Sequence, residues 1–164
     1  SGLPLTFVQS NQVWGGDPLN FSVGAGAIPL KKPDFPNKVH RNVAGSSGIG
    51  TVGDPKRGGT GLNLFANPEA VFNSFRKIRI SEDGRQGRGV LRGFPRWNFD
   101  LSIGKKTAIT ESVRLVFTCD LLNAFNRLEL ADPTLSMLDP ASFGVLTTQF
   151  NTPRFIQLGF RFEW

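Results

Sequence analysis

The side chains best suited to acid–base chemistry are three carboxylates in the second half of the chain, Asp100, Glu111 and Asp120. Two carboxylates on one face of a sheet could divide the roles of general acid and general base. Asp100 and Asp120 could share a face if the strands that carry them are neighbours. Carboxylates in such positions more often pair with cations, here Arg114 or Arg161. We therefore expect ion pairs rather than catalysis.

Histidine and cysteine occur once each, as His40 and Cys119. A metal site built from several His and Cys ligands is therefore excluded, and so is an internal disulfide. His40 lies in the stretch "NKVHRN", where we expect an exposed loop position. Cys119 falls on the apolar side of an alternating stretch and is expected to pack as a small hydrophobe. We expect no enzymatic activity, no cofactor and no bound metal.

A glycine-rich stretch, "GIGTVG", matches the spacing of the dinucleotide-binding fingerprint at Gly48, Gly50 and Gly53. That fingerprint requires a strand before it and a helix after it, because the helix N-terminus meets the pyrophosphate. Here "NVAGSS" precedes the motif and "DPKRGG" follows it, and neither fits. The stretch "GDPKRGGTG" also lacks the Gly-Lys-Ser/Thr ending of a P-loop. Neither motif predicts nucleotide binding.

The composition is that of a turn-rich chain, with 19 Gly and 11 Pro in 164 residues, a length suited to one domain. The net charge is +6, but the basic residues do not form a stripe interleaved with aromatics, so we expect no nucleic-acid partner. A basic surface could instead suit anionic lipid or lipopolysaccharide. No apolar run approaches the ~18 residues of a membrane-spanning helix. The first residues, "SGLPLTFVQS", lack a signal peptide's pattern, so we expect a cytosolic chain or a processed piece of a longer one.

The first part of the chain, residues 1–93, is a series of turn signals with little apolar periodicity. We expect a long loop-rich segment that packs on something else. A short helix is predicted near residues 68–75. Asn67 can cap it, Pro68 suits its first position, and Glu69 suits the positive end of its dipole.

Three stretches in residues 94–164 alternate between apolar and polar side chains, at about 96–104, 112–122 and 154–164. Period-two alternation of this length predicts strands with two unlike faces, and the fold class is therefore all-β and antiparallel. The expected apolar face holds Trp97, Phe99, Leu101, Val113, Leu115, Phe117, Leu158, Phe160, Phe162 and Trp164. The expected polar face holds Asn98, Asp100, Arg114, Thr118, Asp120 and Arg161.

The connections between these strands are unequal, since "GKKTAITE" is short and the loop over residues 123–153 is long. Short turns at one end and long loops at the other are typical of outer-membrane β-barrels, and aromatic residues mark the strand ends as barrel girdles do. A soluble β-sandwich would also alternate, with its apolar face turned inward. The barrel is favoured because charges gather on the polar faces, while the apolar faces carry none until Arg154 at the loop edge. The polar face would then line a wet lumen and the apolar face would meet lipid.

Two long stretches, "GVLRGFPRWNFDLSIGKKTAITESVRLVFTCDLLNAFNR" and "ASFGVLTTQFNTPRFIQLGFRFEW", resemble the C-terminal end of bacterial TonB-dependent outer-membrane receptors. The closest likeness is to the branch with a carboxypeptidase-regulatory-like domain, the Oar-like receptors. "SGLPLTF" and "GLNLFANPEAVFNSFR" resemble a strand top and a long extracellular loop of the same proteins. The final alternating strand with its terminal aromatic resembles the signal that the β-barrel assembly machinery reads.

The resemblance implies an orientation and a role. "GKKTAITE" would be a periplasmic turn, with residues 1–93 and 123–153 outside the cell. The family's plug, its TonB-contacting segment and most of its strands are absent from this sequence, and three strands cannot close a barrel.

Two functional hypotheses follow. In the first, the chain contributes barrel wall and outer loops to nutrient uptake, with the rest of a parent barrel, lipopolysaccharide and the assembly machinery as partners. In the second, it is a processed fragment whose copies add strands to one another and form an extracellular filament. What covers the apolar face, lipid or another subunit, distinguishes them.

Overall fold

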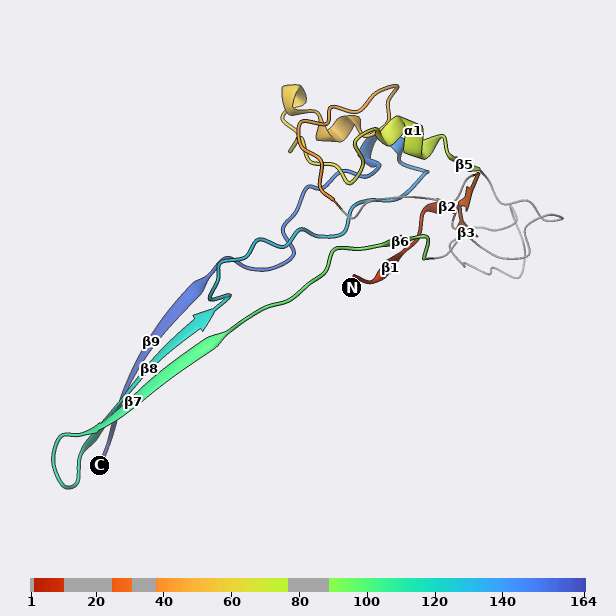
Figure 1. Ribbon diagram of the computed structural model, residues 1–164. Coiled ribbons are helices and arrows are strands. Elements are labelled where there is room, and N and C mark those ends of the chain that lie inside the picture. Colours follow the sequence, from red (N-terminus) through yellow and green to blue (C-terminus); the bar gives the residue numbers. More distant parts are fainter. Residues whose placement is uncertain (1, 11–24, 31–37, 77–88) are drawn as a thin grey trace. The chain divides into compact units, whose positions relative to one another are not determined.

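The computed structural model describes residues 2–10, 25–30, 38–76 and 89–164 (Figure 1). The chain divides into two units, each described here by itself. We call residues 1–95 and 131–148 the loop unit, and residues 96–130 and 149–164 the strand unit. The middle of the long loop over 123–153 therefore belongs to the loop unit, a division that the sequence pattern does not indicate.

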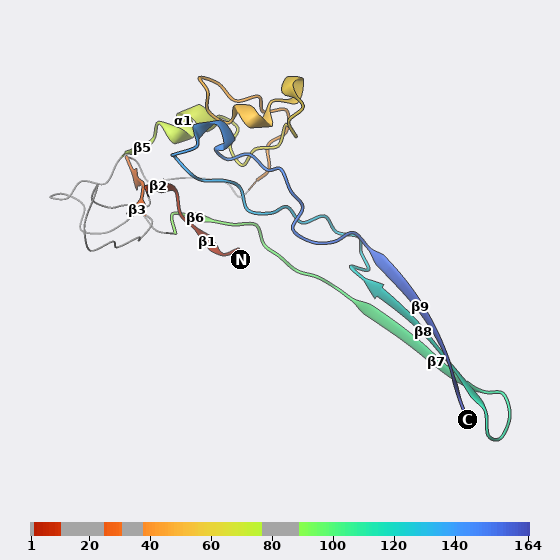
Figure 2. The ribbon, with the colours of Figure 1, turned by 180° about the vertical axis from the view of Figure 1, so that it is seen from behind.

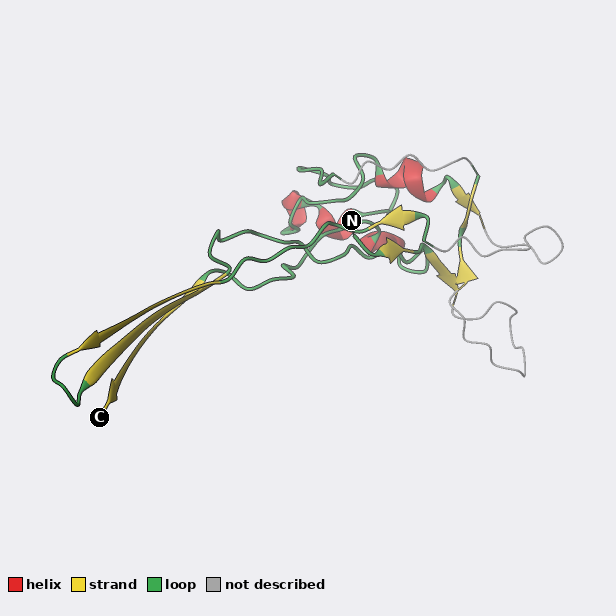
Figure 3. Cartoon of the chain, turned by 60° about the horizontal axis from the view of Figure 1, so that its bottom comes forward, coloured by secondary structure: helices red, strands yellow, loops and turns green. Residues whose placement is uncertain are grey.

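Three long strands make up most of the strand unit: β7 (Leu101–Ala108), β8 (Arg114–Leu122) and β9 (Phe155–Glu163). They form one antiparallel sheet in the order β7-β8-β9 (Figure 3). The β7–β8 turn is closed by backbone hydrogen bonds from Ile109 and Thr110 to the Val113 carbonyl, at 2.9 and 3.2 Å. The short connection predicts an antiparallel hairpin, because a parallel crossover needs a dozen or more residues. The observed pairing of β7 with β8 confirms this prediction.

The first strand is displaced from the range 96–104 that the sequence pattern predicts. It begins at Leu101 because β8 ends at Leu122, and Asn123, with φ of 50°, turns the chain out of the ladder. Residues 96–99 therefore have no β8 residue opposite them. At the other end β7 continues to Ala108, so that only residues 109–113 form the turn. The first five residues of "GKKTAITE" are thus strand.

The register sorts the strand residues into two faces of unlike character. The apolar face consists of four rows across the sheet: Leu101–Leu121–Ile156, Ile103–Cys119–Leu158, Lys105–Phe117–Phe160 and Thr107–Leu115–Phe162. The polar face consists of the rows Ser102–Asp120–Gln157, Gly104–Thr118–Gly159, Lys106–Val116–Arg161 and Ala108–Arg114–Glu163, with the apolar pair Leu122–Phe155 at its loop end. Alternation at period two in all three strands produces this sorting.

One charge lies on the apolar face, contrary to the expectation that this face carries none before Arg154. Lys105 stands opposite Phe117, because β7 runs four residues further than its predicted end. It lies near the turn end of the sheet, where a long side chain can carry its ammonium group out of an apolar layer. Cys119 lies between Ile103 and Leu158 on this face, as a free cysteine.

The loop unit is held by short pairings rather than by long strands. Its elements are best followed from behind, in Figure 2. Its ladders are β1 (Pro4–Leu5) with β6 (Leu91–Arg92), β2 (Val8–Ser10) with β3 (Ala25–Gly26), and β4 (Ile28–Pro29) with β5 (Phe75–Arg76). Its helical elements are α1 (Pro68–Phe72) and three 3₁₀ turns, η1 (Thr51–Gly53), η2 (Pro55–Arg57) and η3 (Pro140–Ser142).

Phenylalanines form the core of the loop unit. Phe7 and Phe143 are fully buried, and their ring centroids lie 5.8 Å apart. Phe75 lies 4.2 Å from Phe7, and Phe65 lies 5.5 Å from Phe143. Residues 1–93, which we expected to pack on another body, thus have a core that Phe143 from the β8–β9 loop completes.

The helix α1 forms where its capping signals predict it, although it ends at Phe72 rather than near residue 75. The Asn67 side chain accepts a hydrogen bond from the Ala70 amide at 3.0 Å, which satisfies one of the helix's open N–H groups. Among the residues that the structure describes, no helix has the length and apolarity needed to cross a membrane.

Candidate functional site: the two faces of the strand unit

The polar face of the sheet gathers four of the six side chains predicted for it, Arg114, Thr118, Asp120 and Arg161. Asn98 and Asp100 lie just before β7, outside the ladder. Lys106, Gln157 and Glu163 join the face as well. Lys106 was not predicted for the polar face, because its strand was expected to end at residue 104.

The two polar-face aspartates do not pair with arginines, so that expectation is wrong. Asp120 accepts a hydrogen bond from Ser102 Oγ in its own row. Asp100 accepts from Asn98 Nδ2 at 2.8 Å and from the Asn123 amide at 2.9 Å. Each carboxylate accepts hydrogen bonds from a neighbouring residue instead of pairing with an arginine. These bonds stabilise the loop end of the sheet.

The cations gather instead at the turn end of the polar face, around Glu163. Its carboxylate accepts from Lys106 Nζ and, at 2.6 Å, from a terminal nitrogen of Arg161. Arg114 stands directly opposite Glu163 in the ladder. Two cations thus share one carboxylate and Arg114 lies beside them, so this end of the face carries excess positive charge.

A hollow lies between the acidic and basic ends of the polar face. It has a volume of about 290 Å³ and is lined by Val116, Thr118, Gly159, Phe160 and Arg161. Gly159 keeps it open, because a Cβ at this position would come within 2.5 Å of Thr118 Oγ1. Sequence reasoning missed the hollow, since only the register brings Gly159 beside Thr118.

The apolar face is as exposed as the polar one. Phe160 is 67% exposed and Leu158 and Phe162 are each more than half exposed. Six of the ten residues predicted for this face lie in the ladder, Leu101, Leu115, Phe117, Leu158, Phe160 and Phe162. Trp97 and Phe99 precede β7, Val113 lies in the turn, and Trp164 follows β9.

Aromatic side chains cluster at the loop end of the strand unit. Trp97 and Phe99 both contact Phe125, with ring centroids 6.1 and 5.2 Å apart. The Arg127 guanidinium lies over the Trp97 ring, 4.5 Å from its centroid. Phe125 stands outside every alternating stretch, between Asn123 and Asn126, which both have positive φ. Its place in the cluster could therefore not be predicted from periodicity.

Buried Asn123 ties the three chain segments together at this end. Its Nδ2 donates to the carbonyls of Arg127 and Thr152, at 3.0 and 2.9 Å, and its Oδ1 accepts from the Arg127 amide at 2.9 Å. The Ala124 amide donates to the Phe99 carbonyl at 2.9 Å. These bonds satisfy backbone groups that the ladder no longer pairs.

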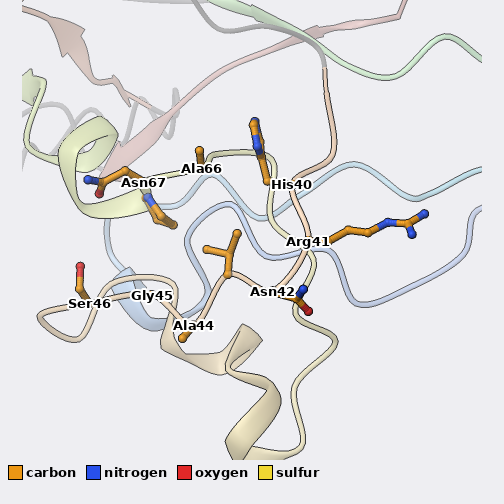
Figure 4. A pocket seen from close by; sticks show the side chains of 10 residues that line it. His40, Arg41, Asn42, Ala44, Gly45, Ser46, Ala66 and Asn67 are labelled. Atoms are coloured by element: carbon orange, nitrogen blue, oxygen red, sulfur yellow. The ribbon is translucent and has the colours of Figure 1, made fainter.

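A second pocket, of about 370 Å³, lies in the loop unit and is shown in Figure 4. His40 and Asn42 line it from one segment and Asn67 from the start of α1, while Arg41 extends away from Ser46 and Asn67 (Figure 4). His40 is half-buried rather than exposed, because its backbone pairs in both directions with that of Asn63, at 2.8 and 3.0 Å.

Next to this pocket, Glu69 accepts hydrogen bonds from the hydroxyls of Ser46 and Ser47, the second at 2.7 Å. These two bonds favour the ionised carboxylate and lower the pKa of Glu69 below its ordinary value of 4.5. The "GIGTVG" stretch leads into the 3₁₀ turn η1, without the strand and helix of a dinucleotide site. No group of three or more metal-ligating side chains gathers within residues 2–10, 25–30, 38–76 and 89–164.

Comparisons with known proteins complete this description. A family model described as "Outer membrane beta barrel domain" matches residues 1–157. Comparisons with curated proteins and with solved structures found no match. The matched range includes the loop unit and the strands β7 and β8, and it ends within β9.

Proposed function

Because the chain belongs to the family of outer membrane β-barrel domains, we propose that it supplies barrel wall and outer loops to a TonB-dependent receptor. The fold is all-β with antiparallel strands, and the protein is located in the bacterial outer membrane. Within that frame the proposed role is nutrient uptake. The protein would bind and pass its ligand unchanged, without catalysis.

The apolar face of the sheet is the observation that supports this proposal most strongly. Leaving a large apolar side chain in water rather than burying it costs roughly 1.5–3 kcal/mol. Phe160, Leu158 and Phe162 are exposed, and further apolar residues of β8 and β7 lie on the same face. A lipid layer would cover them all, and the opposite face, rich in charges, would then line an aqueous lumen.

The resemblance of the sequence to TonB-dependent receptors supports the finer assignment. On that assignment the partners are the remaining strands of the barrel, lipopolysaccharide and the β-barrel assembly machinery. The loop unit would stand on the outer side of the membrane, where irregular backbone can be hydrated.

A second candidate function is supported by the open edges of the sheet. Within the part of the chain that the structure describes, β7 and β9 each pair with β8 alone. An unpaired strand edge is a template for another strand, and copies of this chain could add to one another in a filament. The apolar faces would then cover one another instead of meeting lipid.

Neighbouring residues on β9 allow the two candidates to be separated. In a Cys119→Ser background, Phe160→Cys and Arg161→Cys would each be labelled with a fluorophore in cells that express the protein. If the sheet is barrel wall, a lipid-attached nitroxide quenches the label at position 160, and a water-soluble quencher reaches the label at position 161. If the sheet is the core of a filament, the lipid nitroxide quenches neither label.

The receptor assignment requires its own measurement. Uptake of the nutrient should stop in cells that lack TonB. Uptake that continues without TonB would overturn the receptor assignment, while the quenching result would still decide whether β9 is barrel wall.

A further inference from the structure

The row Gly104–Thr118–Gly159 makes a low strip across the polar face. Only Thr118 carries a side chain in this row. The rows on either side lie about 6.6 Å away along the strands, two residues at about 3.3 Å each, and each row carries longer side chains, among them Gln157 and Arg161. The strip is therefore the floor of a groove between these two rows, and the hollow at Gly159 is the part of it over β8 and β9.

One wall of the groove is cationic. Lys106 and Arg161 stand in the same row, on the outer strands, and the Arg161 side chain is 72% exposed. Arg161 donates to Glu163 through one terminal nitrogen, and the guanidinium has further N–H groups in a planar fork. Such a fork fits a carboxylate with two parallel hydrogen bonds.

The other wall holds Ser102, Asp120 and Gln157. An Asp carboxylate accepts hydrogen bonds from hydroxyl groups but repels an anion, and the Gln amide can both donate and accept. A ligand that is anionic throughout would therefore be repelled at this wall. A ligand with hydroxyl groups on one side and a carboxylate on the other meets complementary groups on both sides.

We propose that this groove binds a carboxylate-bearing sugar, with its carboxylate on Arg161 and Lys106 and its hydroxyl groups toward Asp120 and Gln157. This inference rests on the proposed function in one respect, because it requires the polar face to be in contact with water. It deepens that function by naming the class of substrate. The volume of the hollow, about 290 Å³, suits one sugar unit.

The experiment titrates the full chain, folded in detergent micelles, with D-glucuronate and follows binding by calorimetry. D-glucuronate should bind saturably, and neutral D-glucose should bind about tenfold more weakly or not at all, because it lacks the charge-assisted pair with Arg161. Arg161→Gln should weaken glucuronate binding by about tenfold. Gly104→Ala should weaken it too, since the added methyl raises the floor while making only an ordinary contact, 3.7 Å from the Phe117 carbonyl.

Adjacent lysines supply the matched control. Lys106→Gln and Lys105→Gln remove the same charge from neighbouring positions on opposite faces of β7. Only Lys106→Gln should weaken glucuronate binding, because Lys105 faces away from the groove. Equal effects of both substitutions would show that net charge, not the groove, holds the sugar acid.

Three results would overturn the proposal: no saturable binding of glucuronate, equal affinity for glucose, or displacement of glucuronate by sulfate at equal concentration. These failures are distinct from failure of the proposed function. The proposed function depends on lipid contact at position 160 and on TonB-dependent uptake, which the titration does not measure.

Discussion

Phenylalanine has opposite surroundings in the two units of the molecule. In the loop unit Phe7 and Phe143 are 0% exposed, whereas in the strand unit Phe160 is 67% exposed. The loop unit thus supplies the apolar partners of its own side chains. The strand unit leaves its apolar face without apolar partners among the described residues, as a barrel wall does where it meets lipid.

The two units also satisfy their backbones in different ways. In the strand unit a continuous ladder pairs each strand with its neighbour, the arrangement that a lipid environment demands. In the loop unit, side-chain amides pair with part of the backbone. Buried Asn63 donates to the Phe143 carbonyl at 3.1 Å and accepts from the Phe65 amide at 2.8 Å. Irregular backbone can be buried only when such partners are present.

The largest effect is expected for Phe143→Ala in the loop unit. Phe143 contacts the rings of Phe7, Phe65 and Phe72, and its loss would leave a cavity. The free energy of unfolding of the loop unit should fall by about 3–5 kcal/mol, measured by hydrogen exchange of its buried amides. Phe125→Ala, at a 66% exposed ring, should change stability by less than about 1 kcal/mol. Equal effects would contradict the contrast between the units.

A charge on the apolar face should cost somewhat less. Phe160→Arg is expected to lower the free energy of unfolding in vesicles by about 2–4 kcal/mol, because the charge would lie in the hydrocarbon layer. Arg161→Ala, one residue further on the opposite face, should cost far less. The measurement is denaturant unfolding in vesicles of defined lipid. If the two substitutions do equal damage, the assignment of the faces is wrong.

A smaller effect is expected at the end of the ladder. Asn123→Ala removes three hydrogen bonds to backbone groups of Arg127 and Thr152, and should destabilise the loop end of the sheet by about 1–3 kcal/mol. Hydrogen exchange at the last residues of β8 would measure the change. Asn126→Ala is a matched control, because Asn126 also has positive φ but is exposed and accepts only the Arg154 amide. An equal loss in the control would assign the effect to backbone conformation instead.

The smallest effect concerns pH. The pKa of Glu69 is lowered by its hydrogen bonds to Ser46 and Ser47, so its contribution to stability is present above the ordinary pKa of 4.5. That contribution is lost as the pH falls through the lower pKa of the folded state. Glu69→Gln should therefore reduce the acid sensitivity of the loop unit, measured by thermal unfolding above and below pH 4.5. Glu111→Gln, in the exposed β7–β8 turn, should leave it unchanged.

Much of the strand unit could be predicted from the sequence, because period-two alternation is a local signal. It predicted the three strands, their antiparallel pairing and the two faces. It placed the start of β7 wrongly, because that start depends on where β8 ends and on the register between the two strands. It missed Lys105 and Lys106 as face residues, because the strand was expected to end at residue 104.

The loop unit could be predicted only at α1, where Asn67 and Pro68 are adjacent in the sequence. Its core could not be predicted, since Phe7, Phe65 and Phe143 are far apart and follow no period. The groove at Gly159 could not be predicted either, because it depends on the register between β9 and β8.

The packing of Phe143 against Phe7 has a consequence for the order of folding. Phe7 is made before β8, but its partner Phe143 lies in the loop between β8 and β9 and is made only after β8. Contacts between residues so distant along the chain are slow to form, because a long loop must close first. The apolar rings of the loop unit that precede β7 therefore lack this partner until Phe143 has been made. During that interval they are open to aggregation, and a periplasmic chaperone that shields them would raise the yield of folded protein.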